Sequence, residues 1–509
     1  MEHLYHYLAL FLSIFLITKF LFHRNKNSPP GPFALPLIGH LHLLKQPLCQ
    51  TLESLSLKHG PILSLKFGCR SVLVLSSPSA VDECFAQNDV TFANRPRTMA
   101  GDYLTYNYAN FVWAPYGHVW RSLRRLSTTE ILSQKSLQKF SAIREEQVCS
   151  FVRQLLKIIG NGTQKVELQY LFSTLLFNIM MSVAAGKQCI EEEIATTILG
   201  KQYLQEMKDK FFASLTICMC DFFPILRWVD YKQSKKSMIM LHRQRDEFLQ
   251  GLIEEIRQKK STPLNPTTAL ESEKRTTLIE SLLSLQESDP EYYSDIVVKA
   301  ILLMMFIAGT EMSVITMDWT MSLLLNHPEV LKKVREEIDC HVGPGRLLKD
   351  SDLPKLRYLH CVINETLRLY PAAPLLLPHS SSEDCSVGGF HIPRDTILML
   401  NVWTIHRNPN IWEEPTKFKP ERFEAMDGKK ESFKFIPFGV GRRACPGAAM
   451  GIRMISLALG TLIQCFDLER VGHELVDINP EFGTALRRNK PLEAVCSARH
   501  VMVDVLAQL

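Results

Sequence analysis

The sequence lacks the features of several common protein classes. It has no CxxC motif, and its 13 cysteines, an odd number, are scattered from Cys49 to Cys496. A disulfide framework needs paired cysteines, so this pattern indicates a reducing compartment and directs attention to one cysteine with a chemical role. The 58 Lys and Arg exceed the 53 Asp and Glu by five, too few to favour a nucleic-acid partner. We find no flavin or nicotinamide fingerprint and no internal repeat.

An apolar run lies at the N-terminus. From Tyr7 to Phe22 only Lys19 is charged, and it lies near the end, where its ammonium can reach the membrane interface. The run is slightly shorter than the roughly 20 residues of a membrane span. A cleaved signal peptide is the alternative, but residues 1–3 are not basic and no small-x-small cleavage site follows. The basic residues lie after the run, at positions 23–26, which predicts a cytosolic C-terminal side.

These features divide the chain into three predicted parts. A membrane anchor occupies residues 1–22, a basic and proline-rich hinge residues 23–40, and a folded body residues 41–509. Four prolines between Pro29 and Pro36 make the hinge a stiff, extended spacer. We therefore expect a single-pass anchor with the body in the cytosol.

Helical periodicity dominates the body. Two short pairs of strands are predicted, Ile62–Phe67 with Ser71–Leu75, and Gly389–Ile392 with Thr396–Leu400. The longest helical pattern runs from Ser294 to Leu325, about 32 residues or ~48 Å. A helix so long and apolar must run through the middle of the body. The sequence therefore predicts a mainly α fold with small β-sheets to one side.

One cysteine lies in a loop suited to metal chemistry. Phe438, Gly441, Arg443, Cys445 and Gly447 form the pattern F-x-x-G-x-R-x-C-x-G. A single thiolate can bind haem iron axially and push electron density onto it, which favours O–O cleavage. The glycines allow close approach of the backbone to the sulfur and the porphyrin, and the arginine can pair with a haem propionate. A structural cysteine is the alternative, and five fixed positions in ten residues argue against it.

On these residues the chain resembles the cytochrome P450 superfamily, whose haem-binding motif matches at all five positions. The resemblance implies the fold of that family, with a long central helix over haem b. Glu365 and Arg368 match its E-x-x-R pair, and Arg422 in the segment Pro-Glu-Arg-Phe joins their buried ion network in the family. The body, residues 41–509, is then a haem-thiolate catalytic domain with Cys445 as the axial iron ligand.

Further haem contacts follow from the same resemblance. Trp120 and Arg124 match the W-x-x-x-R helix that holds the propionates, and the two side chains would lie one turn apart. His379 matches a further propionate contact in many relatives. For this histidine, a surface residue without a cofactor role is the alternative.

The central helix departs from the family pattern. The usual [AG]-G-x-[DE]-T-[TS] is here Ala308-Gly309-Thr310-Glu311-Met312-Ser313. The small residues would leave room for O₂. A thioether replaces the threonine hydroxyl that serves proton delivery in the family, and it has no proton to donate. Protons would then pass through Glu311, Ser313 and water, or a substrate hydroxyl would supply them. In the alternative, Met312 has only a packing role and an ordered water carries the protons.

Stretches such as FANRPR and YNYANFVWAPYGHVWRSLRR resemble plant microsomal members of the family, in the group of isoflavone hydroxylases and lignan methylenedioxy-bridge synthases. The resemblance implies an endoplasmic-reticulum enzyme that takes electrons from NADPH through a separate cytochrome P450 reductase. It would oxidise a small lipophilic phenylpropanoid, isoflavonoid, lignan or terpenoid, by hydroxylation or methylenedioxy-bridge formation. The alternatives are a reductase-independent lyase or isomerase acting on a peroxide, and a non-catalytic haem-binding protein.

Three surfaces are predicted around this centre. An aromatic roof at Met99–Trp113 and walls at Phe306, Pro371–Leu377 and Phe482–Leu486 suit a flat or bulky apolar substrate. The apolar segment Phe211–Trp228 would touch membrane lipid, or else form a buried helix pair. A basic surface is predicted to face an acidic surface of the reductase, and a solvated basic face without a partner is the alternative. Its residues are Arg121, Arg125 and Arg442.

Overall fold

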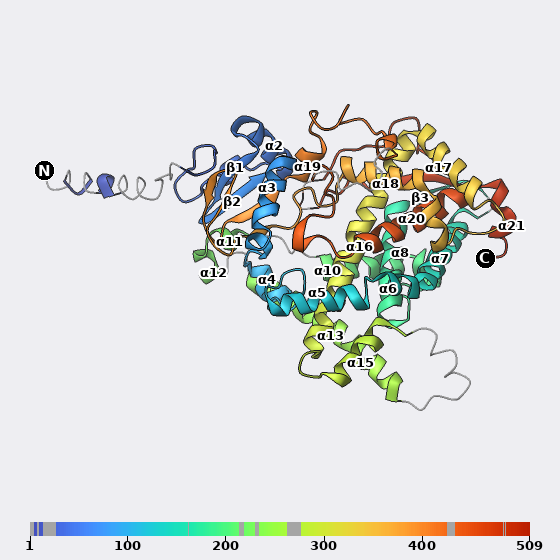
Figure 1. Ribbon diagram of the computed structural model, residues 1–509. Helices are drawn as coiled ribbons and strands as arrows, with labels where there is room; N and C mark the ends of the chain where they lie inside the picture. The colour runs from blue at the N-terminus through green and yellow to red at the C-terminus, as the bar shows by residue number, and fades with distance from the viewer. Residues whose placement is uncertain are drawn as a thin grey trace.

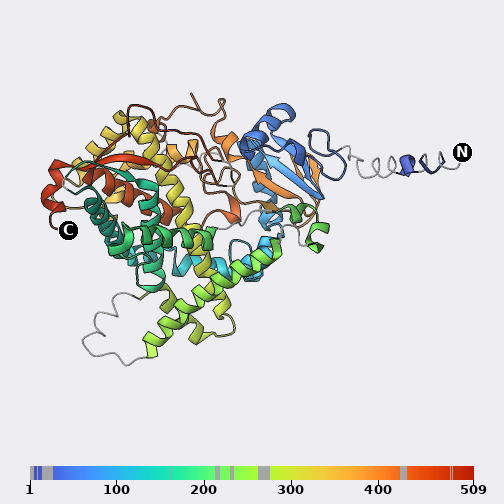
Figure 2. The same cartoon turned by 180° about the vertical axis from the view of Figure 1, so that it is seen from behind.

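The computed structural model describes residues 5–7, 10–13, 27–160, 162–212, 218–229, 234–261, 276–424, 433–481, 483 and 485–509. A four-stranded sheet lies at one side of the molecule and most of the helices at the other (Figures 1 and 2). Of the predicted anchor at 1–22, residues 5–7 and 10–13 are helical and exposed, and the rest lies outside the described residues.

The described chain is mainly helical, as predicted. The α-helices are α2 (Leu48–His59), α3 (Pro78–Asn88), α4 (Met99–Leu104), α5 (His118–Glu130), α6 (Gln134–Lys139), α7 (Ser141–Ile159), α8 (Leu168–Ala185), α9 (Glu192–Ala195), α10 (Ile198–Phe212), α11 (Met219–Phe222), α12 (Ile225–Trp228), α13 (Ser234–Ser261), α15 (Leu278–Ser288), α16 (Asp295–Asn326), α17 (Pro328–His341), α18 (Arg357–Leu369), α19 (Val402–His406), α20 (Ala448–Cys465) and α21 (Val503–Leu506). The short 3₁₀ turns are η1 (Leu41–Leu43), η2 (Thr91–Ala93), η4 (Asp350–Lys355), η5 (Pro420–Phe423), η6 (Gly441–Arg443) and η7 (His500–Met502).

The strands are β1 (Ile62–Phe67), β2 (Arg70–Leu75), β3 (Gln164–Glu167), β4 (His379–Ser380), β5 (Cys385–Val387), β6 (Phe390–Ile392), β7 (Ile397–Leu400), β8 (Phe466–Glu469) and β9 (Glu493–Ala498). They form sheets in the orders β1-β2-β7-β4, β3-β9-β8 and β5-β6. The predicted β1–β2 hairpin is confirmed, with Ile62 opposite Leu75.

The second predicted pair of strands is wrong. β6 pairs with β5, and β7 instead pairs with β2 in parallel and with β4 antiparallel. The four residues of β7 are all buried, with the pattern of a strand inside a larger sheet. A strand of this kind gains more from a central place between β2 and β4 than from a local hairpin.

The long helix is α16, 32 residues, and Figure 1 shows it in yellow through the middle of the molecule. It lies in the largest buried apolar cluster together with α7, α8, α18 and α20. Three helices among the described residues, α8, α16 and α20, are long and apolar enough to cross a membrane, but 94%, 72% and 72% of their most apolar windows are buried inside the protein. Their apolar composition therefore serves the core.

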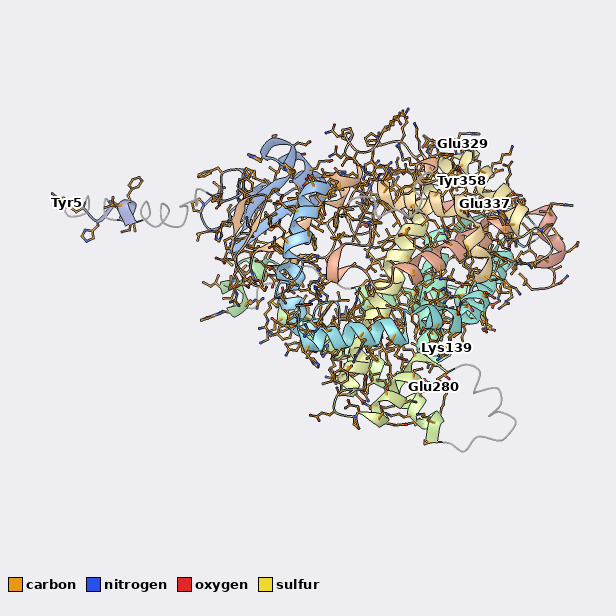
Figure 3. All side chains as sticks on the ribbon, in the orientation of Figure 1. Tyr5, Lys139, Glu280, Glu329, Glu337 and Tyr358 are labelled. Carbon is orange, nitrogen blue, oxygen red and sulfur yellow. The ribbon has the colours of Figure 1, made fainter. Side chains whose placement is uncertain are left out.

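Helix α18, which carries the E-x-x-R pair, is fixed at its start by an acidic side chain of α17. Glu337 accepts hydrogen bonds from the backbone N–H groups of Tyr358, at 2.7 Å, and Leu359, at 3.0 Å. Both Glu337 and Tyr358 are labelled in Figure 3. A carboxylate at these unpaired N–H groups stabilises the helix end.

Candidate active site

The cysteine loop joins η6 to α20 and is closed by its own backbone. Cys445 N–H donates to the Phe438 carbonyl at 2.8 Å, and Ala444 N–H donates to the Gly441 carbonyl at 3.1 Å. Gly441 has φ +66°, and a Cβ there would lie 2.3 Å from Asp89 Oδ1. The glycine is therefore required by its backbone conformation and by the end of α3 packed against it.

The thiol of Cys445 is surrounded by protein atoms and yet open. Burial raises the pKa of Cys445, while the backbone N–H groups of Gly447 and Ala448 and the charge of Arg124 act in the opposite direction. The residue is nevertheless exposed. A thiol that is both desolvated by its surroundings and accessible lies in a hollow rather than on a convex surface. The two N–H groups at the start of α20 stabilise its thiolate form.

One face of α16 is also open. Ala308 is exposed in the middle of the core, and Met305 and Met312 beside it are half-buried. These positions repeat every three to four residues, so they share one face of the helix. Ser313 of α16 and Gly451 of α20 adjoin, because a Cβ on Gly451 would lie 3.9 Å from Ser313 Oγ. We infer that the open thiol and the open face of α16 border one hollow, called the central chamber below.

Three arginines near the cysteine loop are buried or half-buried without an acidic partner. Arg443 Nε donates to the Ala93 carbonyl at 2.6 Å, and Arg124 Nη2 donates to the Ala444 carbonyl at 2.7 Å. Arg95 Nη1 donates at 2.8 Å to the carbonyls of Leu377 and Pro378. No carboxylate of the described residues forms an ion pair with any of these three arginines.

Burial affects the pKa of all three arginines. Burial lowers the pKa of Arg443 to about 8 and that of Arg95 to about 9, and it lowers the pKa of Arg124 as well. A buried cation is normally paired with an anion, because its desolvation is otherwise uncompensated. The three guanidinium groups are therefore suited to a ligand with carboxylate or similar negative charge.

Trp120 and His379 lie in the same region. Trp120 Nε1 donates to the Phe111 carbonyl at 2.8 Å, and the Arg443 guanidinium lies over the Trp120 ring at 4.6 Å. His379 is buried, not on the surface, and its Nδ1 is 2.8 Å from the Phe92 carbonyl. Burial, with the nearby charges of Arg95 and Arg443, lowers the pKa of His379 to about 3, so its ring is neutral.

The predicted ion network is brought together behind the cysteine loop. Arg368 Nε lies 2.7 Å from Glu365 Oε2, and both side chains are completely buried. Arg422 Nε lies 3.2 Å from Glu365 Oε1. Arg368 Nη1 also donates to the carbonyls of His406, at 2.8 Å, and Pro415, at 2.7 Å. The network thus ties α18 to the segment that leads into the cysteine loop.

Comparison with known proteins decides what this arrangement is. The sequence profile described as Cytochrome P450 matches residues 29–495. The chain belongs to the cytochrome P450 family. It is 44% identical over 504 residues to cytochrome P450 81Q32 of Catharanthus roseus, covering 98% of this chain and 97% of that protein. It is 43% identical over 503 residues to an isoflavone 2'-hydroxylase of Medicago truncatula, covering 98% of both chains. It is 42% identical over 515 residues to a (+)-piperitol/(+)-sesamin synthase of Sesamum radiatum, covering 100% of this chain and 99% of that one.

As a cytochrome P450, this chain is an oxidoreductase of the monooxygenase class, and the family implies haem iron. The residues present fit that group. The open thiol of Cys445 offers a soft anionic ligand, and the arginines without acidic partners suit two propionate carboxylates. The small, exposed side chain of Ala308 leaves space on the opposite side of the chamber, next to α16.

The other predicted residues of α16 in this cytochrome P450 have different surroundings. Gly309 faces α8, since a Cβ there would lie 2.8 Å from Met180 Sδ, so close packing of the two helices accounts for its size. Ser313 is buried and its Oγ donates to the Gly309 carbonyl at 3.5 Å. Met312 shares the open face with Ala308, whereas Ser313, one of the two predicted relay residues, is turned toward α20.

Sequence reasoning missed Arg95 as a candidate propionate contact of the cytochrome P450. It lies within the stretch FANRPR, which was used only for the family resemblance. Two features of the sequence could have drawn attention to Arg95. It precedes Pro96, which restricts its backbone, and it lies in a stretch that matches the family. Its proximity to Arg443 depends on the tertiary fold, because both arginines donate to the Val112 carbonyl, at 3.2 Å each.

The predicted pocket walls are only partly seen in this cytochrome P450. Tyr108, Phe111 and Trp113 of the roof are buried. Phe306 is completely buried and packs on Phe211 with ring centroids 5.0 Å apart, so it belongs to the core between α16 and α10. Phe482 lies outside the described residues.

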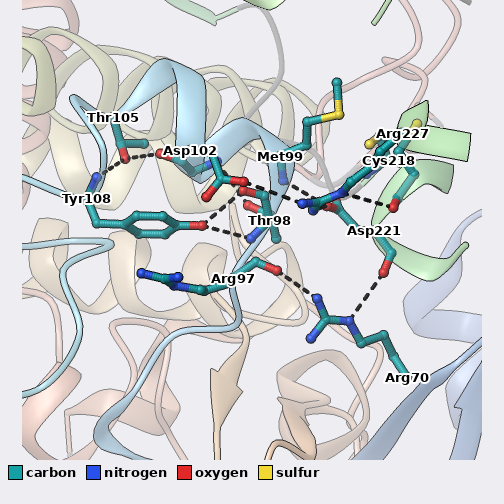
Figure 4. Close-up of polar contacts among 12 residues, drawn as sticks. Arg70, Arg97, Thr98, Met99, Asp102, Thr105, Tyr108, Cys218, Asp221 and Arg227 are labelled. Carbon is teal, nitrogen blue, oxygen red and sulfur yellow. Dashed lines mark hydrogen bonds and ion pairs between the residues drawn. The ribbon is translucent and has the colours of Figure 1, made fainter. Parts of the chain in front are cut away.

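Asp221 of α11 holds the start of the segment Met99–Trp113, the predicted roof of the pocket, in place (Figure 4). Its Oδ1 accepts hydrogen bonds from Met99 N–H at 2.7 Å and from Arg227 Nη2 at 2.8 Å. Its backbone carbonyl accepts from Arg70 Nε at 3.2 Å. Asp221 is buried, so these charge-assisted bonds are strong and hold α4, α12 and the β1–β2 turn together.

Proposed function

We propose that this protein oxidises a lipophilic plant specialised metabolite with O₂ and with electrons that a separate NADPH–cytochrome P450 reductase supplies. The substrate class is a phenylpropanoid, isoflavonoid, lignan or terpenoid, and the reaction is a hydroxylation or the closure of a methylenedioxy bridge. The proposal extends the family assignment with the names of the relatives, which include isoflavone hydroxylases and a sesamin synthase.

One observation carries the proposal: an accessible thiol, Cys445, lies beside arginines that have no acidic partner among the described residues. In this assignment Cys445 is the axial ligand, and Arg95, Arg124, Arg443, Trp120 and His379 surround the propionates. When bound, a thiolate-ligated haem activates O₂ for insertion into a C–H bond. The N–H groups of Gly447 and Ala448 oppose the effect of burial on the pKa of Cys445 and so favour its thiolate form.

The open face of α16 supports a role in substrate and oxygen access. Ala308 leaves space, and Glu311 is the acidic group one position before Met312. Because Met312 cannot donate a proton, protons must come through Glu311 and water or from a hydroxyl of the substrate. A substrate with a phenol beside the oxidised carbon meets the second condition. This chemistry favours an ortho-methoxyphenol and a methylenedioxy product.

An exposed apolar surface supports contact with membrane lipid. Trp228 is 90% exposed, and Ile225 in the same helix is 73% exposed. Leu37, in the hinge, is 82% exposed. The β1–β2 turn joins these segments, because Gly68 N–H donates to the Ile38 carbonyl and Cys69 N–H to the Phe222 carbonyl. We assign this face to the endoplasmic-reticulum membrane, beside the predicted anchor and with the body in the cytosol.

A basic surface outside the cysteine loop supports docking of the reductase. Arg121 and Arg125 of α5 and Arg442 of the loop are exposed. Arg121 and Arg442 lie over the same ring, that of Tyr116, at 5.7 and 5.6 Å. Two segments distant in sequence thus combine into one basic face, which an acidic partner surface would complement.

The test is turnover in microsomes that contain the protein, offered isoflavonoids, lignans and terpenoids with and without the reductase. The proposal predicts a product that needs NADPH, O₂ and the reductase. Product formed from a peroxide without the reductase would instead identify a lyase or isomerase. Ligand binding without any product would identify a non-catalytic haem-binding protein.

A further inference from the structure

A second face of α16, distinct from the chamber face, carries buried charge. Glu311 and Asp318 are seven residues apart, which places both on one side of the helix. That side meets the C-terminal loop, by which we mean the described residues 476–481 and 485–488. Trp319 Nε1 donates to the Leu486 carbonyl of this loop at 2.6 Å. Further along, Asn326 exchanges two hydrogen bonds with the Val476 backbone.

Consecutive arginines of the loop meet the two acids. Arg487 Nη2 contacts Glu311 Oε1 as an ion pair. Arg488 Nη1 lies 3.7 Å from Asp318 Oδ2, and these two side chains are 3% and 2% exposed. Lys208 of α10 faces the same group, since it interacts electrostatically with both Asp318 and Arg487. Two acids and three cations therefore gather between α16, α10 and the loop.

Three buried atoms of this group lack hydrogen bonds among the described residues. They are Glu311 Oε1, which makes its ion contact without hydrogen-bond geometry, Asp318 Oδ1 and Arg488 Nη1. Buried polar atoms in proteins are almost always satisfied, by protein groups or by ordered water. A water molecule needs two or more polar partners, and this group supplies them. Asp318 Oδ1 and Arg488 Nη1 are polar partners of the kind that an ordered water between the helix and the loop requires.

We propose that Asp318, paired with Arg488, supplies protons through ordered water to Glu311, which Arg487 holds beside Met312. The proposal rests on the proposed monooxygenase function. In each transfer an O–H bond of Asp318 breaks and one forms on the first of several waters. Each water passes one proton on along the roughly 10 Å that seven residues span on a helix. The last water gives a proton to the Glu311 carboxylate, and Asp318 regains a proton from solvent. Asp318 does not touch the substrate and acts only through Glu311.

Two features of the site suit this task. Burial raises the pKa of Asp318 to about 7, with Arg488 and Lys208 opposing, so near neutral pH the carboxyl both gains and loses protons. The arginines are permanently charged and therefore orient water and carboxylates without competing for the proton. The proposed proton path ends at Glu311, next to Met312, where a thioether replaces the usual threonine hydroxyl.

The first experiment is infrared spectroscopy of the purified holoenzyme, without turnover. The wild type is expected to show a protonated carboxyl band at pH 6 that is lost toward pH 8, and Asp318→Asn is expected to lack it. The matched control is Asp295→Asn, on the same helix and paired with Arg257 at 2.6 Å, which should keep the band. A wild-type spectrum without such a band, or one that Asp318→Asn leaves unchanged, overturns the proposal.

The second experiment measures product and hydrogen peroxide per NADPH consumed, normalised to carbon-monoxide-reactive haem. Asp318→Asn should lower the product fraction about tenfold, less than the ~10²–10⁴ of a complete proton-transfer group, because Asp318 acts only through Glu311. Asp318→Glu should restore it, and Asp295→Asn should leave it unchanged. The pH dependence of the product fraction should also flatten in Asp318→Asn. A wild-type ratio of product to hydrogen peroxide in Asp318→Asn would contradict the relay while leaving the monooxygenase function intact. Because the amounts are normalised to haem, the ratio can be compared even if less of the variant folds.

Discussion

The two sides of the central chamber are built differently. The loop side, residues 436–447 with the arginines around it, is fixed by backbone hydrogen bonds and carries positive charge without acidic partners. The helix side, positions 305–312 of α16, is open at Ala308 and apolar at Ala308 and Met312, whereas Glu311 lies on the other face, paired with Arg487. The loop side thus holds a charged group in one place, whereas the helix side leaves room for variable ligands. Substitutions should therefore disturb binding and stability on the loop side and reaction outcome on the helix side.

The largest effect is expected behind the loop side, at Glu365. Glu365→Gln removes the carboxylate that neutralises the buried Arg368 and Arg422, and an uncompensated buried charge costs about 3–5 kcal/mol. Urea unfolding of the purified protein measures this loss. The control is Glu329→Gln, whose carboxylate is 66% exposed beside His327 and should change stability little. Equal effects of the two substitutions would contradict the role of the network.

Adjacent arginines of the loop give a sharper contrast. Arg443→Gln removes a buried cation of the proposed propionate site, and we expect haem to dissociate about tenfold more readily, as for other groups that support a cofactor. Arg442→Gln removes an exposed cation paired with Asp89 at 3.5 Å and should leave haem retention unchanged. Haem transfer to apomyoglobin measures the rate. If Arg442→Gln loses haem as fast as Arg443→Gln, the assignment of the buried site is wrong.

The segment leading into the loop should make the protein sensitive to acid. His406 Nε2 accepts a hydrogen bond from Ile436 N–H at 3.0 Å, and burial lowers the pKa of His406 to about 3 from 6.5. Below pH 6.5 the unfolded chain binds a proton that the folded protein does not, so stability falls with pH down to about 3.

Between pH 6.5 and 5.5 the loss attributable to His406 is about 1 kcal/mol. Unfolding curves at several pH values should be flatter for His406→Gln than for the wild type. His391→Gln serves as the control for the loss of a histidine whose side chain is 39% exposed. An identical slope in the wild type and His406→Gln would show that other groups cause the acid sensitivity.

The smallest effect is expected on the helix side, at Met312. Met312→Thr restores a hydroxyl on the open face of α16 and should change the ratio of product to peroxide by about threefold, less than a full relay contributes. Met312→Leu keeps an apolar side chain of similar size without a hydroxyl and should behave as the wild type. Products and peroxide are measured per haem. Unchanged products and coupling in Met312→Thr would mean that Met312 only packs.

Local patterns predicted what depends on neighbouring residues. The β1–β2 hairpin needs only the Gly68–Cys69 turn between its strands, and α16 follows from periodicity alone. The pairing of β7 with β2 could not be predicted, because it joins residues more than 300 positions apart. The same holds for Arg95 and for Arg488 with Asp318. Their importance comes from burial and from partners that only the folded chain brings together.

The most direct test of the central claim is the absorption spectrum of the reduced protein under carbon monoxide. Cys445 as a thiolate ligand of haem iron predicts the long-wavelength Soret band of thiolate-ligated haem in the wild type and its absence in Cys445→Ser. Cys340→Ser, which changes an exposed cysteine at the end of α17, should keep the band. A wild-type protein without the band, or a Cys445→Ser protein that retains it, would contradict the account.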